Sequence, residues 1–117
     1  MARIRHISLN AEDPRALAEF YKATLGMAEL KLGAEGSPAI YLSDGYIQFV
    51  ILPARGQREG VDHFGFEVES VEAVAAAAEA AAGPAWKPPY TPPGQFANLR
   101  IYDPVGAGID LGTHWQA

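Results

Sequence analysis

Cysteine is absent from the 117 residues, which excludes disulfides, thiolate zinc sites and cysteine nucleophiles. No apolar run approaches the ~18 residues that a membrane span needs, and the first residues contain no apolar signal-peptide core. Basic residues are few: nine Lys and Arg against fourteen Asp and Glu leave a net charge of −5. That balance argues against nucleic acid or an anionic membrane as a partner. We therefore expect an acidic, soluble, cytoplasmic protein.

The composition is that of a globular protein. Hydrophobic residues make up 49% of the chain and charged residues 20%, which does not fit a disordered segment. The length predicts a single domain, residues 1–117, with enough chain to bury a core without staples. Neither a dinucleotide-binding glycine fingerprint nor a P-loop occurs.

The chain repeats one strand–helix unit. Alternating apolar residues predict strands at 5–10 and 62–68, and the segments 14–25 and 71–82 have the pattern or the composition of helices. Three landmarks recur at a spacing of 57 positions, namely the strand histidine, the helix N-cap and the glycine that ends the helix: His6 and His63, Asp13 and Ser70, Gly26 and Gly83. Three matches in register indicate two copies of the same unit.

Further strands complete each copy. Alternation and turn signals predict them at 27–33, 38–43 and 46–52 in the first copy, and at 96–102 and 108–113 in the second. Five of the nine prolines lie between Pro84 and Pro93, and because proline cannot donate to a sheet this stretch is an edge strand or a rim loop. We expect two strand–helix–strand–strand–strand modules, at about 1–53 and 61–117, joined by a linker at about 54–60.

Strand alternation places polar residues on one face of the predicted sheet. The bulky apolar residues belong under the helices, so the opposite face carries four possible metal ligands: His6, Gln48, His63 and Asp110. The two histidines occupy equivalent positions in the modules, and Gln48 matches Asp110 at a spacing of 62. Two imidazoles and one carboxylate can hold a divalent metal and leave coordination positions open.

Several segments resemble the vicinal oxygen chelate superfamily, the glyoxalase, bleomycin-resistance and dioxygenase family. They are Arg5-His6-Ile7-Ser8-Leu9, Phe20-Tyr21-Lys22-Ala23-Thr24-Leu25-Gly26-Met27, Asp62-His63-Phe64-Gly65-Phe66 and the stretch from Asp103 to Leu111. The resemblance implies an α+β fold in which two βαβββ modules form one cupped mixed sheet around a metal. It also implies metal ligands at His6, Gln48, His63 and Asp110, in an order similar to that of methylmalonyl-CoA epimerase.

Asp110 departs from the family pattern, which usually has glutamate at the last ligand. Aspartate is one methylene shorter, so either the metal lies closer to that strand or the site binds none. The identity of the metal, among Zn, Ni, Mn, Co and Fe, stays open.

The resemblance implies a metal-dependent lyase, isomerase or epimerase that acts on a small substrate with vicinal oxygens, in a homodimer. Glu67 is the candidate general base. The simpler interpretation of this residue, which we prefer, is an ion pair, for which Arg100 is one candidate partner. Five residues are candidates for substrate binding: Arg100, Tyr102, Tyr41, Trp86 and Phe96. Two other functions remain open. One is a binding protein that sequesters an aromatic or cationic compound without metal, and the other is an Fe(II) dioxygenase.

Overall fold

A computed structural model describes all 117 residues, as seven β-strands, two α-helices and one short 3-10 helix. The chain divides into two compact units. The N-terminal unit comprises His6–Asp62 with Gln116–Ala117, and the C-terminal unit comprises His63–Trp115 with Met1–Arg5. Each unit therefore includes a few residues from the opposite terminus of the chain.

Helix α1 (Pro14–Leu25) begins and ends where the sequence predicts. The Asp13 side chain accepts a hydrogen bond from the Ala16 amide at 3.0 Å, and Pro14 occupies the first helical position. Gly26 ends the helix in the left-handed conformation, with φ 68°. The apolar side of α1 packs on the sheet of the N-terminal unit, while Arg15 and Lys22 bind Glu29 at its edge, at 2.8 and 3.1 Å.

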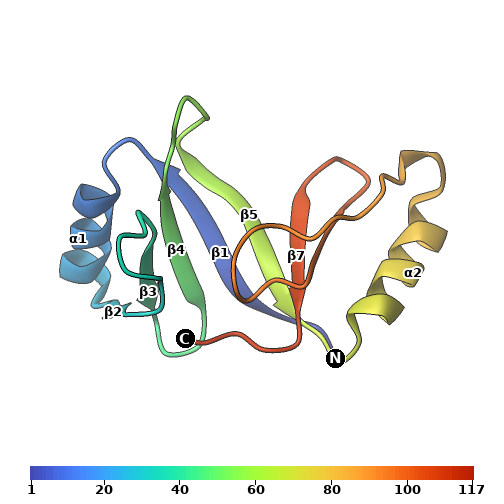
Figure 1. The fold of residues 1–117 in the computed structure, drawn as a ribbon, viewed down its shortest axis with the longest axis horizontal. Helices are drawn as coiled ribbons and strands as arrows, with labels where there is room; N and C mark the ends of the chain where they lie inside the picture. Colours follow the sequence, from blue (N-terminus) through green and yellow to red (C-terminus); the bar gives the residue numbers. More distant parts are fainter. The chain divides into compact units, whose positions relative to one another are not determined.

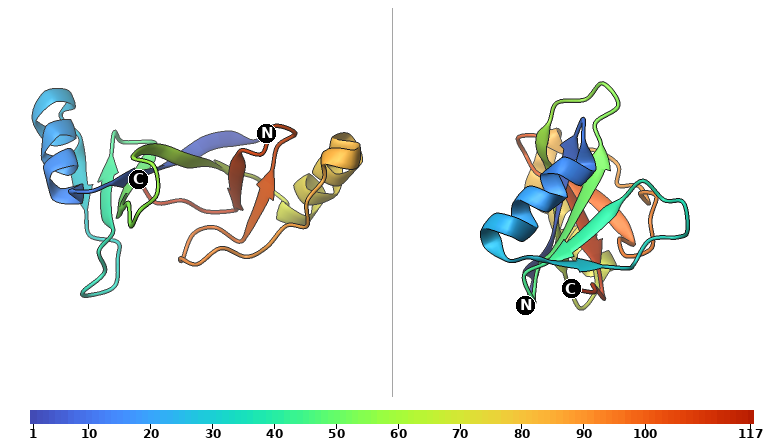
Figure 2. Two further views of the ribbon diagram at one scale, coloured as in Figure 1. Left: turned by 90° about the horizontal axis from the view of Figure 1, so that it is seen from above. Right: turned by 90° about the vertical axis from the view of Figure 1, so that its left-hand side faces the viewer.

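That sheet has four strands in the order β2-β3-β4-β1. Their bounds are β1 Arg3–Ala11, β2 Ala28–Leu30, β3 Ile40–Ser43 and β4 Gln48–Pro53, and β1 begins in the C-terminal unit. β1 runs parallel to β4, with His6 opposite Gln48. The core under α1 contains Ala18, Leu42 and Ile51, all fully buried. Figures 1 and 2 show α1 beside these strands.

The C-terminal unit has three strands in the order β5-β7-β6. β5 spans Gly60–Glu67, β6 Leu99–Tyr102 and β7 Gly108–Gly112. β5 is parallel to β7, and β6 is antiparallel to β7. Helix α2 (Val71–Ala82), capped by the Ser70 side chain, covers Leu111 and its apolar neighbours on β6 and β7.

A loop replaces one strand of the second module. The proline-rich stretch follows the 3-10 helix η1 (Gly83–Ala85) and meets β6 only at an isolated bridge between Tyr90 and Arg100. The amides of these two residues donate to each other's carbonyl oxygens, at 3.2 and 2.7 Å. Prolines on both sides of Tyr90 remove the amide donors that a longer ladder would need, so the rim loop is the form that occurs.

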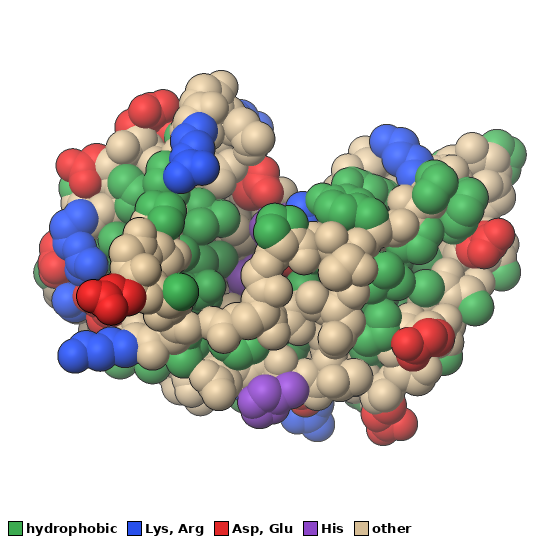
Figure 3. Space-filling view, viewed as in Figure 1, with side chains coloured by type: hydrophobic (Ala, Val, Ile, Leu, Met, Phe, Trp, Pro, Cys, Tyr) green, Lys and Arg blue, Asp and Glu red, His purple; other side chains and the backbone are tan.

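The α+β class predicted from the repeat is confirmed, and the strands make mixed sheet. The helices match the expected ranges, whereas the strands at 27–33 and 96–102 are shorter than expected. Neither helix has the length and apolar character to cross a membrane. Figure 3 shows charged side chains of both signs side by side along the edge formed by α1.

Candidate metal centre

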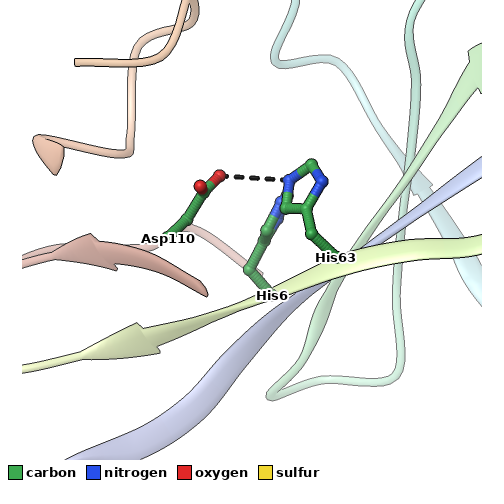
Figure 4. Close-up of side chains that lie close together, drawn as sticks. All are labelled: His6, His63 and Asp110. Carbon is green, nitrogen blue, oxygen red and sulfur yellow. Dashed lines mark ion pairs between the residues drawn. The ribbon is translucent and has the colours of Figure 1, made fainter. Parts of the chain in front are cut away.

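His63 and Asp110 form a buried pair in the C-terminal unit. His63 lies on β5 and Asp110 on β7, where the parallel register places Asp110 beside Gly65. His63 is 9% exposed and Asp110 4%. The Nε2 atom of His63 lies 3.1 Å from Oδ2 of Asp110, the ion pair drawn as a dashed line in Figure 4. Both side chains project from the sheet face opposite α2, as the alternation predicts.

Arg100 holds the same carboxylate from the neighbouring strand. It lies directly opposite Asp110 in the antiparallel register of β6 and β7. Its Nε donates to Oδ1 of Asp110 at 2.5 Å, and its Nη2 donates to Oδ2 at 3.2 Å. Nη2 also lies 3.2 Å from Nε2 of His63. The guanidinium therefore makes a two-bonded fork on Asp110, the strong geometry for this pair of groups.

These contacts fix the charge of Asp110. Burial by itself would raise the pKa of this carboxyl, but hydrogen bonds from His63 and Arg100 outweigh the burial and lower the pKa to about 2. Asp110 is thus a carboxylate at neutral pH, which is the form that a metal ligand needs.

His6 and Gln48 form a second buried pair, in the N-terminal unit. Nδ1 of His6 lies 3.0 Å from Oε1 of Gln48, and the Gln48 amide nitrogen donates to the carbonyl oxygen of Gln116 at 2.9 Å. With the nitrogen of Gln48 acting as a donor to that carbonyl, its oxygen is left as an acceptor for His6. Nδ1 of His6 then carries the proton, and Nε2 keeps a lone pair that can bind a metal.

The donor set in the C-terminal unit fits a divalent ion. Ligand atoms at about 2.0–2.2 Å from a tetrahedral ion are separated from each other by roughly 3.4 Å. Nε2 of His63 and Oδ2 of Asp110 are 3.1 Å apart, close to that separation. An imidazole with a carboxylate is also a donor set that zinc and its neighbours accept.

Glu67, the candidate base, binds Arg5 at 2.9 Å. The Arg5 Nη2 atom also donates to the carbonyl oxygen of Trp115, at 3.3 Å. Glu67 thus forms an ion pair, as the alternative to a general base expected, but its partner is Arg5 and not Arg100. The hairpin register gives the Arg100 fork to Asp110 instead. Side-chain alternation was the correct guide to the face but does not choose among partners on it.

The aromatic candidates lie in different places. Tyr102 stacks on Tyr90 with ring centroids 6.4 Å apart, and the Lys87 amine lies 5.5 Å from the Tyr102 ring centre. The hydrogen bond with Tyr90 raises the pKa of Tyr102. Phe96 stacks on Trp115. Trp86 follows η1 and is 37% exposed.

Tyr41 belongs to the N-terminal unit. It lies on β3 opposite Leu30 of β2 and Val50 of β4. The structure thus brings Arg100 and Tyr102 together with Asp110, as neighbours on β6 and β7, and gives Phe96 a packing contact with Trp115.

Two features of the site escaped the sequence reasoning. The first is the pairing of Arg100 with Asp110, whose signal was available: the turn at 103–106 fixes a hairpin in which the two residues are opposite. The second is Ser8, whose hydroxyl is buried without a hydrogen-bond partner two residues beyond His6 on the same strand. No pattern in the sequence distinguishes this serine.

Residues 3–111 match the Glyoxalase/Bleomycin resistance protein/Dioxygenase superfamily. The chain belongs to that superfamily, as the resemblance of its motifs indicated. None of the curated proteins compared with the chain matches it.

Solved structures share the fold at low sequence identity. A hypothetical protein from Bacillus halodurans C-125 superposes with a TM-score of 0.74 at 17% identity, covering 99% of this chain and 97% of the other. A methylmalonyl-CoA epimerase in complex with methylmalonyl-CoA gives 0.68 at 23% identity, with 95% and 93% covered. The 2,3-dioxygenase LapB from Pseudomonas sp. KL28 gives 0.70 at 20% identity, over 98% of this chain and 41% of that one. Enzymes of different reactions thus share the fold, so the fold alone does not choose the reaction.

Proposed function

We propose that the protein is a metal-dependent enzyme of the lyase, isomerase or epimerase kind, acting on a small substrate with neighbouring oxygen atoms. Its metal ligands in this proposal are those that the resemblance implies, His6, His63 and Asp110. The observation that carries the proposal is the buried pair of His63 and Asp110, whose Nε2 and Oδ2 atoms lie 3.1 Å apart, near the separation of two ligands on one divalent ion.

The His6 ring is held in the tautomer whose Nε2 can bind a metal. Gln48 accepts from Nδ1 and is itself anchored on the main chain at Gln116, so the ring is oriented by a neighbour that does not compete for Nε2. In this proposal Gln48 positions His6, because its amide oxygen is already bonded to that ring.

A divalent ion at these residues would polarise a substrate carbonyl and stabilise the negative charge that develops when the adjacent carbon loses a proton. Among the chain's own groups, Glu67 is the carboxylate proposed to move that proton, with Arg5 holding it in place at 2.9 Å. Tyr102 and Lys87 lie together near the rim, and offer an aromatic face and a positive charge to an acidic substrate.

The order of His6, Gln48, His63 and Asp110 along the chain supports an epimerase-like reaction over the other two functions. A sequestering protein would have no need of buried, oriented imidazoles. An Fe(II) dioxygenase would use the same two-histidine, one-carboxylate set, and the identity of the bound metal distinguishes it.

The first prediction is metal content. Protein purified without affinity metals and analysed by elemental mass spectrometry should contain close to one divalent ion per chain. His63→Ala and Asp110→Asn should each lose most of that metal while keeping their helical circular dichroism, because neither residue belongs to the apolar cores. His114→Ala is the matched control, since this third histidine is exposed and lies outside the proposed ligands.

A wild-type protein free of metal, and unable to take up Zn²⁺, Co²⁺, Mn²⁺ or Fe²⁺ in a titration, would contradict the enzyme proposal. The binding-protein function would then take its place. Iron in the purified protein, with the other metals absent, would favour the dioxygenase.

A further inference from the structure

We propose that Arg100 is a built-in competitor for the metal: it occupies Asp110 in the metal-free protein and so sets how tightly the site binds a divalent ion. The inference rests on the proposed metal site. It adds a residue that controls occupancy of the site without being a ligand.

The competition concerns the same atoms. Arg100 donates to both carboxylate oxygens of Asp110, and its Nη2 also lies 3.2 Å from Nε2 of His63. Oδ2 of Asp110 and Nε2 of His63 are two of the atoms that would bind the ion. A metal that binds both must therefore displace the Nη2 contacts, or take a carboxylate oxygen whose lone pairs already serve the guanidinium.

Charge works in the same direction. The guanidinium is permanently positive and half-enclosed, with its side chain 18% exposed beside a carboxylate 5% exposed. At such short range, and with little water to screen it, a fixed positive charge opposes the arrival of a divalent cation. The negative charge that would attract the ion is neutralised by the same group.

The Arg100 guanidinium has a second partner besides Asp110. Its Nη1 donates to the Tyr90 hydroxyl at 2.8 Å, and the guanidinium carbon lies 5.6 Å from the centre of that ring. Tyr90 is fixed to β6 by the two main-chain hydrogen bonds of its bridge with Arg100. The guanidinium can thus leave Asp110 and keep the Tyr90 hydroxyl as a hydrogen-bond partner. This retained bond lowers the free energy needed to release the carboxylate. An acidic substrate group that bound the fork would favour the same release.

The test is the metal affinity of substituted proteins, measured with Co²⁺ by isothermal titration and by the absorption of the bound ion. Arg100→Gln removes the charge and the fork, and should bind Co²⁺ at least about tenfold more tightly than the wild type, the factor expected for one charge-assisted hydrogen bond. Arg100→Lys keeps the charge without the fork and should fall between the two.

Arg15→Gln is the matched control. It removes an equal charge and another two-bonded arginine–carboxylate pair, formed with Glu29 at 2.8 and 3.0 Å, in the N-terminal unit. Its Co²⁺ affinity should equal that of the wild type. Near-ultraviolet circular dichroism of each variant shows whether the fold is kept, and Arg100→Lys serves if Arg100→Gln does not fold.

The outcomes separate the two proposals. Equal or weaker Co²⁺ binding by folded Arg100 variants, with a wild type that binds, would overturn the competitor role and leave the metal site standing. Binding by neither the wild type nor any variant would overturn the metal site, and the competitor role with it.

Discussion

Ser8 is the residue whose environment fits its chemistry least well. Its side chain is fully buried on β1, and its hydroxyl has no hydrogen-bond partner. Val50, the residue beside it in the register, is apolar and offers none. A buried hydroxyl without a partner destabilises the folded state by about 1–3 kcal/mol. Such groups persist in proteins where they serve a ligand, a water molecule or a reaction.

Ser8→Ala should therefore leave the free energy of unfolding unchanged or raise it by about 1 kcal/mol, because it removes the unsatisfied hydroxyl and little volume. Urea denaturation followed by circular dichroism measures the change. Ser43→Ala is the control: this serine is also buried, but its Oγ accepts from the Gly45 amide at 2.8 Å, so the substitution should cost about 1 kcal/mol. A loss at position 8 as large as that at position 43 would show that the hydroxyl has a partner in solution.

Residues of the candidate site were predictable as far as strand alternation reaches. The alternation correctly put His63 and Asp110 on the face away from the α2 core. It could not decide which of the cations and carboxylates on a face pair with each other, because that depends on register between strands. The fork of Arg100 on Asp110 and the binding of Glu67 to Arg5 are both consequences of register.

At the scale of elements, the helices were the most predictable part. Asp13, Pro14 and Gly26 are local signals, and each acts within one turn of the residue that carries it. The lengths of the strands were less predictable than the helices. β2 has only three residues and β6 only four, because pairing ends where the partner strand or its amide donors end. No local sequence pattern predicts the residue at which this pairing ends.

Gly112, at the end of β7, is predicted to be intolerant of any side chain. A Cβ atom there would lie 2.6 Å from the Phe96 carbonyl oxygen and 3.2 Å from the Trp115 ring. Trp115 is 3% exposed and donates to the Phe66 carbonyl at 3.2 Å, so its ring cannot move away without disturbing that buried contact. Gly112→Ala should lower the free energy of unfolding by about 1–3 kcal/mol, the usual cost of overpacking.

Gly108, at the start of the same strand, provides the comparison. A Cβ atom there would meet Arg100 and His63 at 3.5 and 3.6 Å, which are ordinary contacts. Gly108→Ala should therefore change the unfolding midpoint little. Midpoints in urea for the two variants test the difference directly, and equal losses at both positions would refute the close-approach argument for β7.

At the scale of the whole molecule, the edge of the N-terminal unit is the surface that we expect a second copy of the chain to bind. β2 is the outermost strand of its sheet, and it directly follows an α1 that exposes large apolar side chains at Phe20 and Leu25, 56% and 69% exposed. Large apolar side chains exposed beside a sheet edge are the kind of surface that a second chain covers. Two-fold homodimers are also the commonest soluble oligomers.

We therefore predict a homodimer that uses the α1–β2 edge. Light scattering at micromolar concentration should give twice the mass of the 12.5 kDa chain. Phe20→Glu should weaken the dimer at least about tenfold in sedimentation, since it would bury an unpaired charge in the interface. Val105→Glu is the control, because Val105 is 91% exposed in the turn between β6 and β7, in the other unit. A monomeric wild type would contradict the dimer, whereas a dimer insensitive to Phe20→Glu would move the interface to another surface, with the proline-rich loop beside β6 the next to test.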